Sequence, residues 1–355
     1  TGAALNQINI SANQPITFNQ SIFNANPLSE GDSLLSIDAS ASSAGITMET
    51  DFESHILDIV GGSGDDHFDM EEGDAFDGGN GDDTAHFSSS VFGEFFFGET
   101  VALANNEVLG GAVVAAVVGG AMLDSSLINV ETVLVSDGME STFNFSQQTE
   151  DLIFEVLNSD FIELIAGSGN DTLIASVGEE FLTGGLGADE FSMNFPGTAV
   201  SFGQDIITDF TVADGDQLDL DGAGTQAKNI SGLSQLQLVG NGSRDDEVYI
   251  ANTELVLIDN SAPDVISVAS FTSIAVADYL VNVGGNSLFN LDSVVFEKGD
   301  SLFYLVVSDG IDSAVFAADA ALGNGDLTID AAELVLIATL EGITDTSSLA
   351  GSFIF

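Results

Sequence analysis

The stretch GGSGDDHFD, residues 61–69, places three glycines ahead of two adjacent aspartates. Related stretches follow as GGNGDDTAH at 78–86, AGSGNDTLI at 166–174 and GGLGADEFS at 184–192. A shorter copy, MEEGDAFD at 70–77, lies between the first two. A single Gly-Asp pair would indicate only a hairpin turn. Four related copies in two clusters argue against isolated turns and indicate a repeat.

The repeat has a period of nine residues in the second cluster. Three consecutive nonapeptides cover 166–192, each with Gly at position 4, an acid at position 6 and a large apolar residue at position 8. This is the GGxGxDxUx pattern of the calcium-binding parallel β-roll. Glycine permits the backbone angles of a tight turn, and position 8 faces the interior of the roll. Two nonapeptides make one coil, so repeats n and n+2 stack, with calcium between the stacked turns.

The composition explains why cations are needed. The chain has 355 residues, of which 57 are acidic and 3 basic, for a formal charge of -54. Its only bases are Lys228, Arg244 and Lys298. Self-repulsion on this scale opposes compaction. With so few bases the chain cannot make the phosphate contacts that nucleic acids and anionic membranes require, so both are excluded as direct partners. Hydrophobic residues make up 45%, which is enough for folded cores rather than an acidic disordered tail.

The sequence contains neither cysteine nor a recognisable leader. Without Cys there is no disulfide or thiolate site. No basic segment followed by an apolar one opens the chain, and its first residue is Thr1, so we expect a processed product or a fragment. The apolar run at 108–123 is too short to span a bilayer as a helix. We predict a buried strand pair or an interface there.

The four motifs resemble the RTX proteins that Gram-negative bacteria export by type I secretion. The resemblance covers about 61–86 and 166–355, where 203–221 is similar to the closing strands after RTX rolls and the apolar end is similar to an uncleaved secretion region. It implies calcium ligands at the glycine carbonyls of positions 2 and 4 and at the acid of position 6. These residues are Gly62, Gly64, Asp66, Gly79, Gly81, Asp83, Gly167, Gly169, Asp171, Gly185, Gly187 and Asp189. Gly73 with Asp74, and Gly178 with Glu180, are expected at the opposite edges.

A narrower resemblance is to calcium-dependent S-layer proteins of the Caulobacter type. INVETVLV at 128–135 and SLLSIDASAS at 33–42 carry it. It implies a lattice or filament of identical subunits on the cell surface, assembled with calcium, with possible contact to surface polysaccharide. The chain departs from that family in being short and in lacking a region recognisable as the anchoring domain.

The predicted fold is mainly β. Calcium-binding parallel β-rolls are embedded in β-sandwich or solenoid-like segments, followed by a β-rich C-terminal domain with one or two short helices. Helices are predicted at 273–283 and at 331–341, the second with Asp330 as N-cap, Glu333 in a capping box and Gly342 at its end. The expected domains are 1–60 (β segment), 61–87 (first roll), 88–165 (β segment with the Phe- and Gly-rich run), 166–222 (second roll and closing strand pair) and 223–355 (secretion and assembly).

Other candidate sites are weaker. GNGDLTID at 323–330 hints at an EF-hand loop, but its twelfth position would be Ala331 rather than Glu. His55, His67 and His86 lie in or beside the first roll; because His67 and His86 occupy different repeat positions, they do not imply a shared metal site, and we interpret them as solvated. The four phenylalanines within 91–100 fit a core edge or a subunit contact equally well.

No catalytic motif stands out. HExxH and GxSxG are both missing from the sequence, and a glycosidase pair cannot be picked out among so many acids. The sequence therefore predicts an exported, extracellular, non-enzymatic calcium-binding protein that self-assembles at the surface of a Gram-negative cell. The alternatives are the C-terminal calcium-folded module of an RTX adhesin or the carrier part of a secreted hydrolase.

Overall fold

The computed structural model describes the chain between residues 7 and 354, with gaps. The described residues are 7–19, 35–49, 57–70, 74–88, 99–106, 111–118, 121–123, 126–128, 130–136, 140–146, 149, 151–157, 161–193, 204–220, 236–239, 255–258, 271, 302–319 and 334–354. The chain forms two compact units. The first comprises Thr1–Ser176 with Gly184–Asp189, and the second comprises Val177–Thr183 with Glu190–Phe355.

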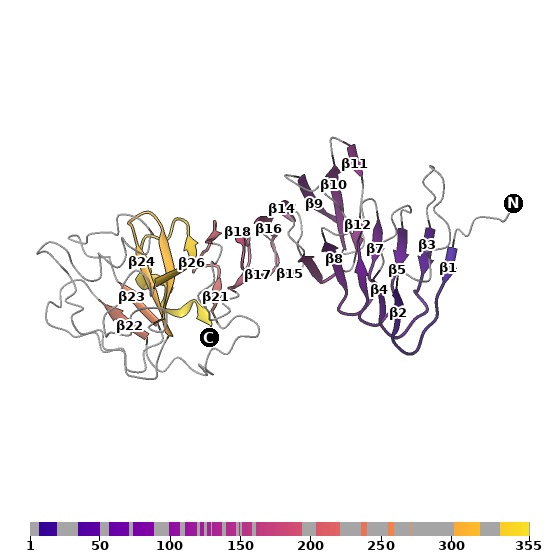
Figure 1. The fold of residues 1–355 in the computed structure, drawn as a ribbon, viewed down its shortest axis with the longest axis horizontal. Coiled ribbons are helices and arrows are strands. Elements are labelled where there is room, and N and C mark those ends of the chain that lie inside the picture. Colours follow the sequence, from indigo (N-terminus) through magenta and orange to yellow (C-terminus); the bar gives the residue numbers. More distant parts are fainter. Residues whose placement is uncertain are drawn as a thin grey trace, which may run out of the picture. The chain divides into compact units, whose positions relative to one another are not determined.

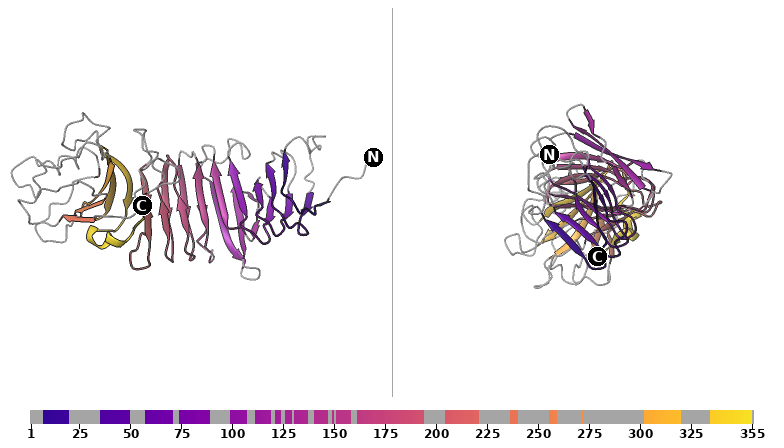
Figure 2. Two further views of the ribbon diagram at one scale, coloured as in Figure 1. Left: turned by 90° about the horizontal axis from the view of Figure 1, so that it is seen from below. Right: turned by 90° about the vertical axis from the view of Figure 1, so that its right-hand side faces the viewer.

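In the first unit the chain alternates between two parallel sheets (Figures 1 and 2). The first sheet contains β1 (Gln7–Asn9), β3 (Leu35–Asp38), β5 (Leu57–Val60), β7 (Ala75–Asp77) and β12 (Ser126–Ile128). The second sheet contains β2 (Ile16–Asn19), β4 (Ile46–Glu49), β6 (His67–Asp69), β8 (Thr84–Ser88), β13 (Thr132–Ser136), β15 (Ile153–Leu157) and β17 (Thr172–Ile174). Because consecutive strands from β1 to β8 go to alternate sheets, the chain coils with two strands per turn.

The remaining described strands of this unit form a mixed set, in which some pairs are antiparallel and others parallel. It contains β9 (Glu99–Asn106), β10 (Gly111–Val118), β11 (Ala121–Leu123), β14 (Glu140–Asn144) and β16 (Phe161–Ile165). β10 pairs antiparallel with both β9 and β11, whereas β14 pairs parallel with both β9 and β16. Residues 111–118 and 121–123 of the apolar run form the paired strands β10 and β11, as predicted for a strand pair, while the burial of their side chains lies outside the description.

The core of the first unit is built by alternation along each short strand. In β6 and β7 the central residues, Phe68 and Phe76, are fully buried and their ring centroids lie 4.3 Å apart. Phe143 and Phe154 make a similar pair at 5.3 Å. The apolar residue at repeat position 8 is inside, as predicted, because side chains of a strand alternate between its two faces.

The second unit also contains two sheets. One has the order β18 (Glu179–Thr183), β20 (Asp205–Ile207), β26 (Leu334–Leu340), β25 (Ser313–Asp319), β24 (Leu302–Ser308), β23 (Leu255–Ile258) and β22 (Leu236–Val239). The other contains β19 (Glu190–Ser192), β21 (Gln217–Asp219) and β27 (Phe353–Ile354), with the short 3-10 helix η3 (Thr346–Gly351) before β27. The buried Tyr304 hydroxyl donates to the carbonyl of Leu220, 2.9 Å away, and thereby ties β24 to the end of β21.

The predicted helix at 331–341 is wrong, because residues 334–340 form strand β26. Leu334, Ile337 and Leu340 do have helical spacing, but nearly every residue of this run is apolar, so the spacing does not discriminate. The strand pairs with β20 and β25, and a bulge opposite Val315 and Phe316 leaves three consecutive residues of β26 buried. Gly342, at φ +74°, follows the strand rather than ending a helix.

The predicted closing strand pair at 203–222 is also corrected. Its two strands, β20 and β21, belong to different sheets and do not pair with each other. β20 pairs with β18 and β26, and β21 pairs with β19 and β27. This segment therefore continues both sheets instead of capping them, because a further strand pairs with each.

Helical structure is sparse in the part of the chain that the structure describes. The helix predicted at 273–283, the N-cap Asp330 and the loop 323–330 all lie outside the described residues, as do the phenylalanines of 91–100. Within the described ranges, no helix has both the length and the apolar character required to cross a bilayer.

We expect Phe68→Ala to destabilise the first unit by about 3–4 kcal/mol, because it opens a cavity beside Phe76. Urea unfolding at fixed ionic conditions measures this change. Leu186→Ala is the matched control, since Leu186 is 68% exposed and its truncation should change stability by less than about 0.5 kcal/mol. Equal effects of the two substitutions would contradict the assigned core.

Candidate functional site

The four predicted turn motifs share one edge of the coil in the first unit. Asp66, Asp83 and Asp171 come directly before β6, β8 and β17 of the second sheet. The fourth motif stacks on the third, since the N–H of Leu186 donates to the carbonyl of Gly167 at 2.9 Å. The two clusters were predicted as separate rolls, but β8 pairs with β13, β13 with β15 and β15 with β17. The clusters therefore lie along one edge of one sheet.

Each position-6 aspartate reaches back to the preceding coil. Its Oδ1 accepts a hydrogen bond from the backbone N–H of the residue stacked beneath it. These bonds join Asp66 to Ile46 (2.7 Å), Asp83 to Asp66 (2.7 Å), Asp171 to Leu152 (2.8 Å) and Asp189 to Asp171 (2.8 Å). All four aspartates are at most 2% exposed. The equivalent geometry at four positions shows that the motifs are structurally equivalent turns.

The second carboxylate oxygens of these aspartates differ from turn to turn. Oδ2 of Asp66 accepts from the N–H of Gly62 at 2.8 Å, and Oδ2 of Asp171 accepts from Gly167 at 3.2 Å. Oδ2 of Asp83 is buried without a hydrogen-bond partner. An unpaired buried carboxylate oxygen is costly, so this atom marks a place where a cation would be stabilising.

Glu131 is a member of this edge that the motif search missed. Its Oε2 accepts from the N–H of Asp83 at 2.9 Å, which is the bond that an aspartate makes in the other turns. The signal was present in the sequence, because Asp83, Glu131 and Asp171 are each followed by Thr and an alternating apolar strand. We call the five residues Asp66, Asp83, Glu131, Asp171 and Asp189 the acid column.

Burial raises the pKa values of three members of the acid column. For Asp83 burial raises the pKa to about 7; the N–H of Asp66 partly offsets this effect, and the charges of Asp66 and Glu131 add to it. For Asp171 burial raises the pKa to about 6, against the N–H groups of Leu152 and Gly167. The pKa of Asp66 is raised for the same first reason. The full negative charge of the column is therefore unfavourable near neutral pH unless a cation compensates it.

Glycine is required in the upper turn of each stacked pair. Gly79 and Gly185 have φ of +96° and +97°, and Gly81 and Gly187 have +141° and +136°. A Cβ at Gly79 or Gly185 would overlap the carbonyl oxygen of the glycine below it, Gly62 or Gly167. These carbonyls each accept one hydrogen bond, from Asn80 and Leu186. Direct stacking of backbone on backbone thus lines the edge with carbonyl oxygens that keep a second lone pair.

The opposite edges hold further buried acids. Asp74 Oδ1 accepts from the N–H of Leu57 at 2.7 Å, across β5 and β7, as predicted for an opposite edge; Gly73 lies outside the described residues. In the second unit, Glu180 follows Gly178 and lies against Asp205, whose Oδ1 accepts from the Glu180 N–H at 3.0 Å. Burial and then the charge of Glu180 raise the pKa of Asp205 well above its usual value. Asp205 was not among the predicted site residues.

The donor set of these turns consists of oxygen atoms alone. Buried carboxylates and glycine carbonyls are ligands that hard divalent cations prefer, and nitrogen and sulfur ligands are lacking. The two hydrogen bonds accepted by Asp66 or Asp171 leave lone pairs on the same oxygens. The residues therefore fit an oxygen-coordinated cation at the predicted positions.

Comparison with known proteins assigns no family to this chain. No family model and no curated protein matches it. The interpretation of the turns therefore depends on the residues and contacts of the chain itself.

Metal-free protein should lose stability as the pH rises from about 4 to about 7. The folded Asp83 keeps its proton in this range while the unfolded one loses it, so the unfolded state is favoured at higher pH. We expect Asp83→Asn to be more stable than the parent by about 1–3 kcal/mol at pH 7.5 in chelator, with a smaller pH slope. Urea unfolding between pH 5 and 8 measures both. Asp82→Asn, at the exposed neighbouring position, should keep the parent's slope; a slope unchanged in Asp83→Asn would contradict the assignment.

Gly185→Ala should destabilise the protein by about 2–3 kcal/mol, because it adds a contact with the Gly167 carbonyl to the strain of a positive φ. Gly342→Ala is the control, since Gly342 has φ +74° but open space around its Cβ position. In thermal unfolding, Gly342→Ala measures the strain of a positive φ alone, and Gly185→Ala measures that strain together with the clash against the Gly167 carbonyl. Equal losses would mean that close stacking of the turns contributes nothing.

Proposed function

We propose that this chain is an exported calcium-binding structural protein that self-assembles on the surface of a Gram-negative cell. The observation that carries the proposal is the acid column, a row of stacked acids along one edge, four of them buried. No Lys or Arg occurs in the first 227 residues, so neither residue type from that stretch can neutralise the column. The three bases of the whole chain cannot balance its 57 acids, so cations from the surroundings are the partners that we propose for the column, in a structural rather than enzymatic role.

Calcium is the cation that suits these turns best. It takes six to eight oxygen ligands in flexible geometries. The carboxylates of the acid column and the carbonyls of glycines at repeat positions 2 and 4 would hold it, in the manner of an RTX parallel β-roll. When bound, calcium would supply the positive charge that the edge lacks. The free Oδ2 of Asp83 and the raised pKa values of Asp83 and Asp171 support this assignment.

The proposed mechanism couples folding to export. Where calcium is scarce, repulsion within the acid column lowers the stability of the fold, which suits the chain to type I secretion. Outside the cell, each turn filled at a calcium concentration one hundredfold above its dissociation constant adds about 2.7 kcal/mol of stability. Extracellular calcium modules bind at about 10⁻⁴–10⁻³ M, so folding would follow the calcium level of the surroundings.

Self-assembly into a lattice or filament is the most specific part of the proposal. It rests on the resemblance of 33–42 and 128–135 to S-layer segments, whose described residues include strand β3 and most of strand β13. At a formal charge of -54, neighbouring subunits repel one another. Divalent cations that bridge acidic faces would remove that obstacle to association.

Electron microscopy of the purified chain in millimolar calcium and after chelation tests the proposal. We expect ordered sheets or filaments that dissolve on chelation. The double variant Asp83→Asn/Asp171→Asn lacks two anionic ligands and should bind calcium at least tenfold more weakly by calorimetry, so it should need correspondingly more calcium to assemble. The double variant Asp82→Asn/Asp151→Asn removes the same charge from exposed positions and should behave as the parent.

Two other outcomes would overturn parts of the proposal. Folded monomers in calcium would refute self-assembly and favour the calcium-folded module of an adhesin or of a secreted hydrolase. Calorimetry that detects no calcium binding at millimolar concentrations would refute the calcium assignment itself.

A further inference from the structure

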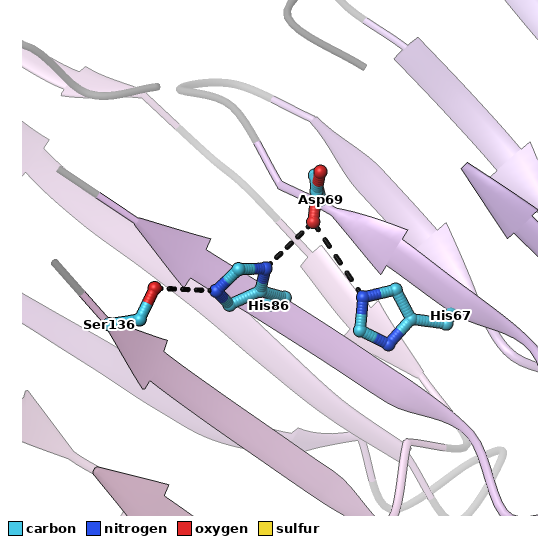
Figure 3. A network of polar contacts seen from close by, with 4 residues as sticks. All are labelled: His67, Asp69, His86 and Ser136. Carbon is cyan, nitrogen blue, oxygen red and sulfur yellow. Dashed lines mark hydrogen bonds and ion pairs between the residues drawn. The ribbon is translucent and has the colours of Figure 1, made fainter. Parts of the chain in front are cut away.

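The outer face of the second sheet carries a cluster that the turns do not use. Three side chains converge there, His67 and Asp69 from β6 and His86 from β8, with Ser136 of β13 beside them (Figure 3). Nδ1 of His86 lies 2.7 Å from Oδ1 of Asp69, and Nε2 of His67 lies 3.7 Å from the same oxygen. Nε2 of His86 lies 2.7 Å from the Ser136 hydroxyl.

The parallel register explains why these residues meet. β6 and β8 align His67 with Thr84 and Asp69 with His86. His67 is thus a diagonal neighbour of His86, two residues away on the same outward face, with ring centroids 5.8 Å apart. The sequence comparison, which found no shared metal site implied by the two histidines, did not anticipate that their side chains lie together. It compared positions within the repeat, whereas positions 7 and 9 of stacked repeats lie on the same face.

The three side chains offer a ligand set for a transition metal. Their ligand atoms all lie within 4.8 Å of one another. Ligands around a tetrahedral zinc ion at about 2.1 Å are about 3.4 Å apart, so small side-chain shifts bring them into position. The side chains are 32% (His67), 20% (His86) and 19% (Asp69) exposed. The three side chains are thus partly covered and partly open to solvent, so an ion and a water ligand can reach them.

Ser136 is placed as the outer partner of a metal-binding histidine. Metal-bound histidines usually donate their other ring N–H to a neighbouring acceptor, which fixes the ring. The Ser136 hydroxyl, 6% exposed for the residue as a whole, can accept from Nε2–H when Nδ1 binds a metal. It can donate to Nε2 when Nδ1–H bonds to Asp69 instead. The same contact therefore holds the ring both with and without an ion.

The ligand chemistry separates this cluster from the turns. Two imidazole nitrogens with a carboxylate suit zinc, copper or nickel, whereas calcium prefers oxygen ligands alone. The field of the chain concentrates cations of either kind at its surface. Selection between them then depends on ligand type, and the cluster supplies the nitrogens that the acid column does not have.

We propose that His67, Asp69 and His86 bind a divalent transition-metal ion of the zinc class, with Ser136 orienting His86. This site is independent of the calcium-binding turns. It sits on the outward face of the sheet, where an ion with an open coordination position can also accept a ligand from solvent or from a neighbouring molecule.

Titration of the full chain with Zn²⁺ in saturating calcium tests the proposal, because calcium then occupies the oxygen-only carboxylate sites. We expect one high-affinity equivalent by calorimetry, and Co²⁺ substitution should give the visible absorption of a tetrahedral nitrogen–oxygen site. His67→Gln and His86→Gln should each weaken Zn²⁺ binding at least a hundredfold. Ser136→Ala should weaken it by about 10–100-fold.

His55→Gln is the matched control, since it removes the third histidine of the chain and should leave the Zn²⁺ affinity unchanged. Circular dichroism in calcium checks that each variant folds as the parent does, so a loss of Zn²⁺ binding with calcium-induced folding intact concerns this site alone. Zn²⁺ binding that is absent from the parent, or that survives unchanged in both His67→Gln and His86→Gln, would overturn the proposal.

Discussion

The contact on which the first unit depends is the hydrogen bond from a backbone N–H in one coil to a carboxylate in the next. It sets the register of each turn on the turn below and leaves a row of negative charges at the spacing of β-strands, about 4.8 Å. Neighbouring charges at that spacing repel by roughly 3 kcal/mol at an effective dielectric constant of 20. The bond that aligns the coils therefore also creates the charge that must be compensated. Burial of these acids and their raised pKa values are two results of one geometry.

The two faces of the same strands carry different chemistry. Residues that point inward, such as Phe68 and Phe76, build an apolar core that needs no ion. The turns at the strand ends collect oxygen ligands, and the outward residues of β6 and β8 collect imidazole nitrogens. Strand alternation, with a period of two, keeps these groups apart although they are adjacent in sequence. Asp66, His67 and Phe68 are consecutive residues that serve a turn, an outer cluster and the core.

Much of the turn edge could be predicted from the sequence, because a nine-residue period fixes both the glycine positions and the buried apolar residue. Glu131 was not predicted because its turn contains no glycine and shares only the acid with the four motifs and the following Thr with two of them. The histidine cluster was not predicted because the pairing register between repeats decides which outward residues meet, and the position within a repeat does not. The segment 334–340 was mistaken for a helix because nearly all of its residues are apolar and therefore fit the helical and the strand period alike. Its pairing with β20 and β25 decides its conformation.

Leu152 breaks the acid column. It occupies the rung between Glu131 and Asp171, where its N–H donates to Asp171 but its side chain brings no charge. In a solenoid each rung interacts energetically with its neighbours, and this rung bonds to both of them through its backbone without adding a charge to the column. The column then behaves as two short one-dimensional arrays, Asp66 to Glu131 and Asp171 to Asp189. Charge repulsion within the column is therefore divided between two short arrays instead of accumulating along one long one.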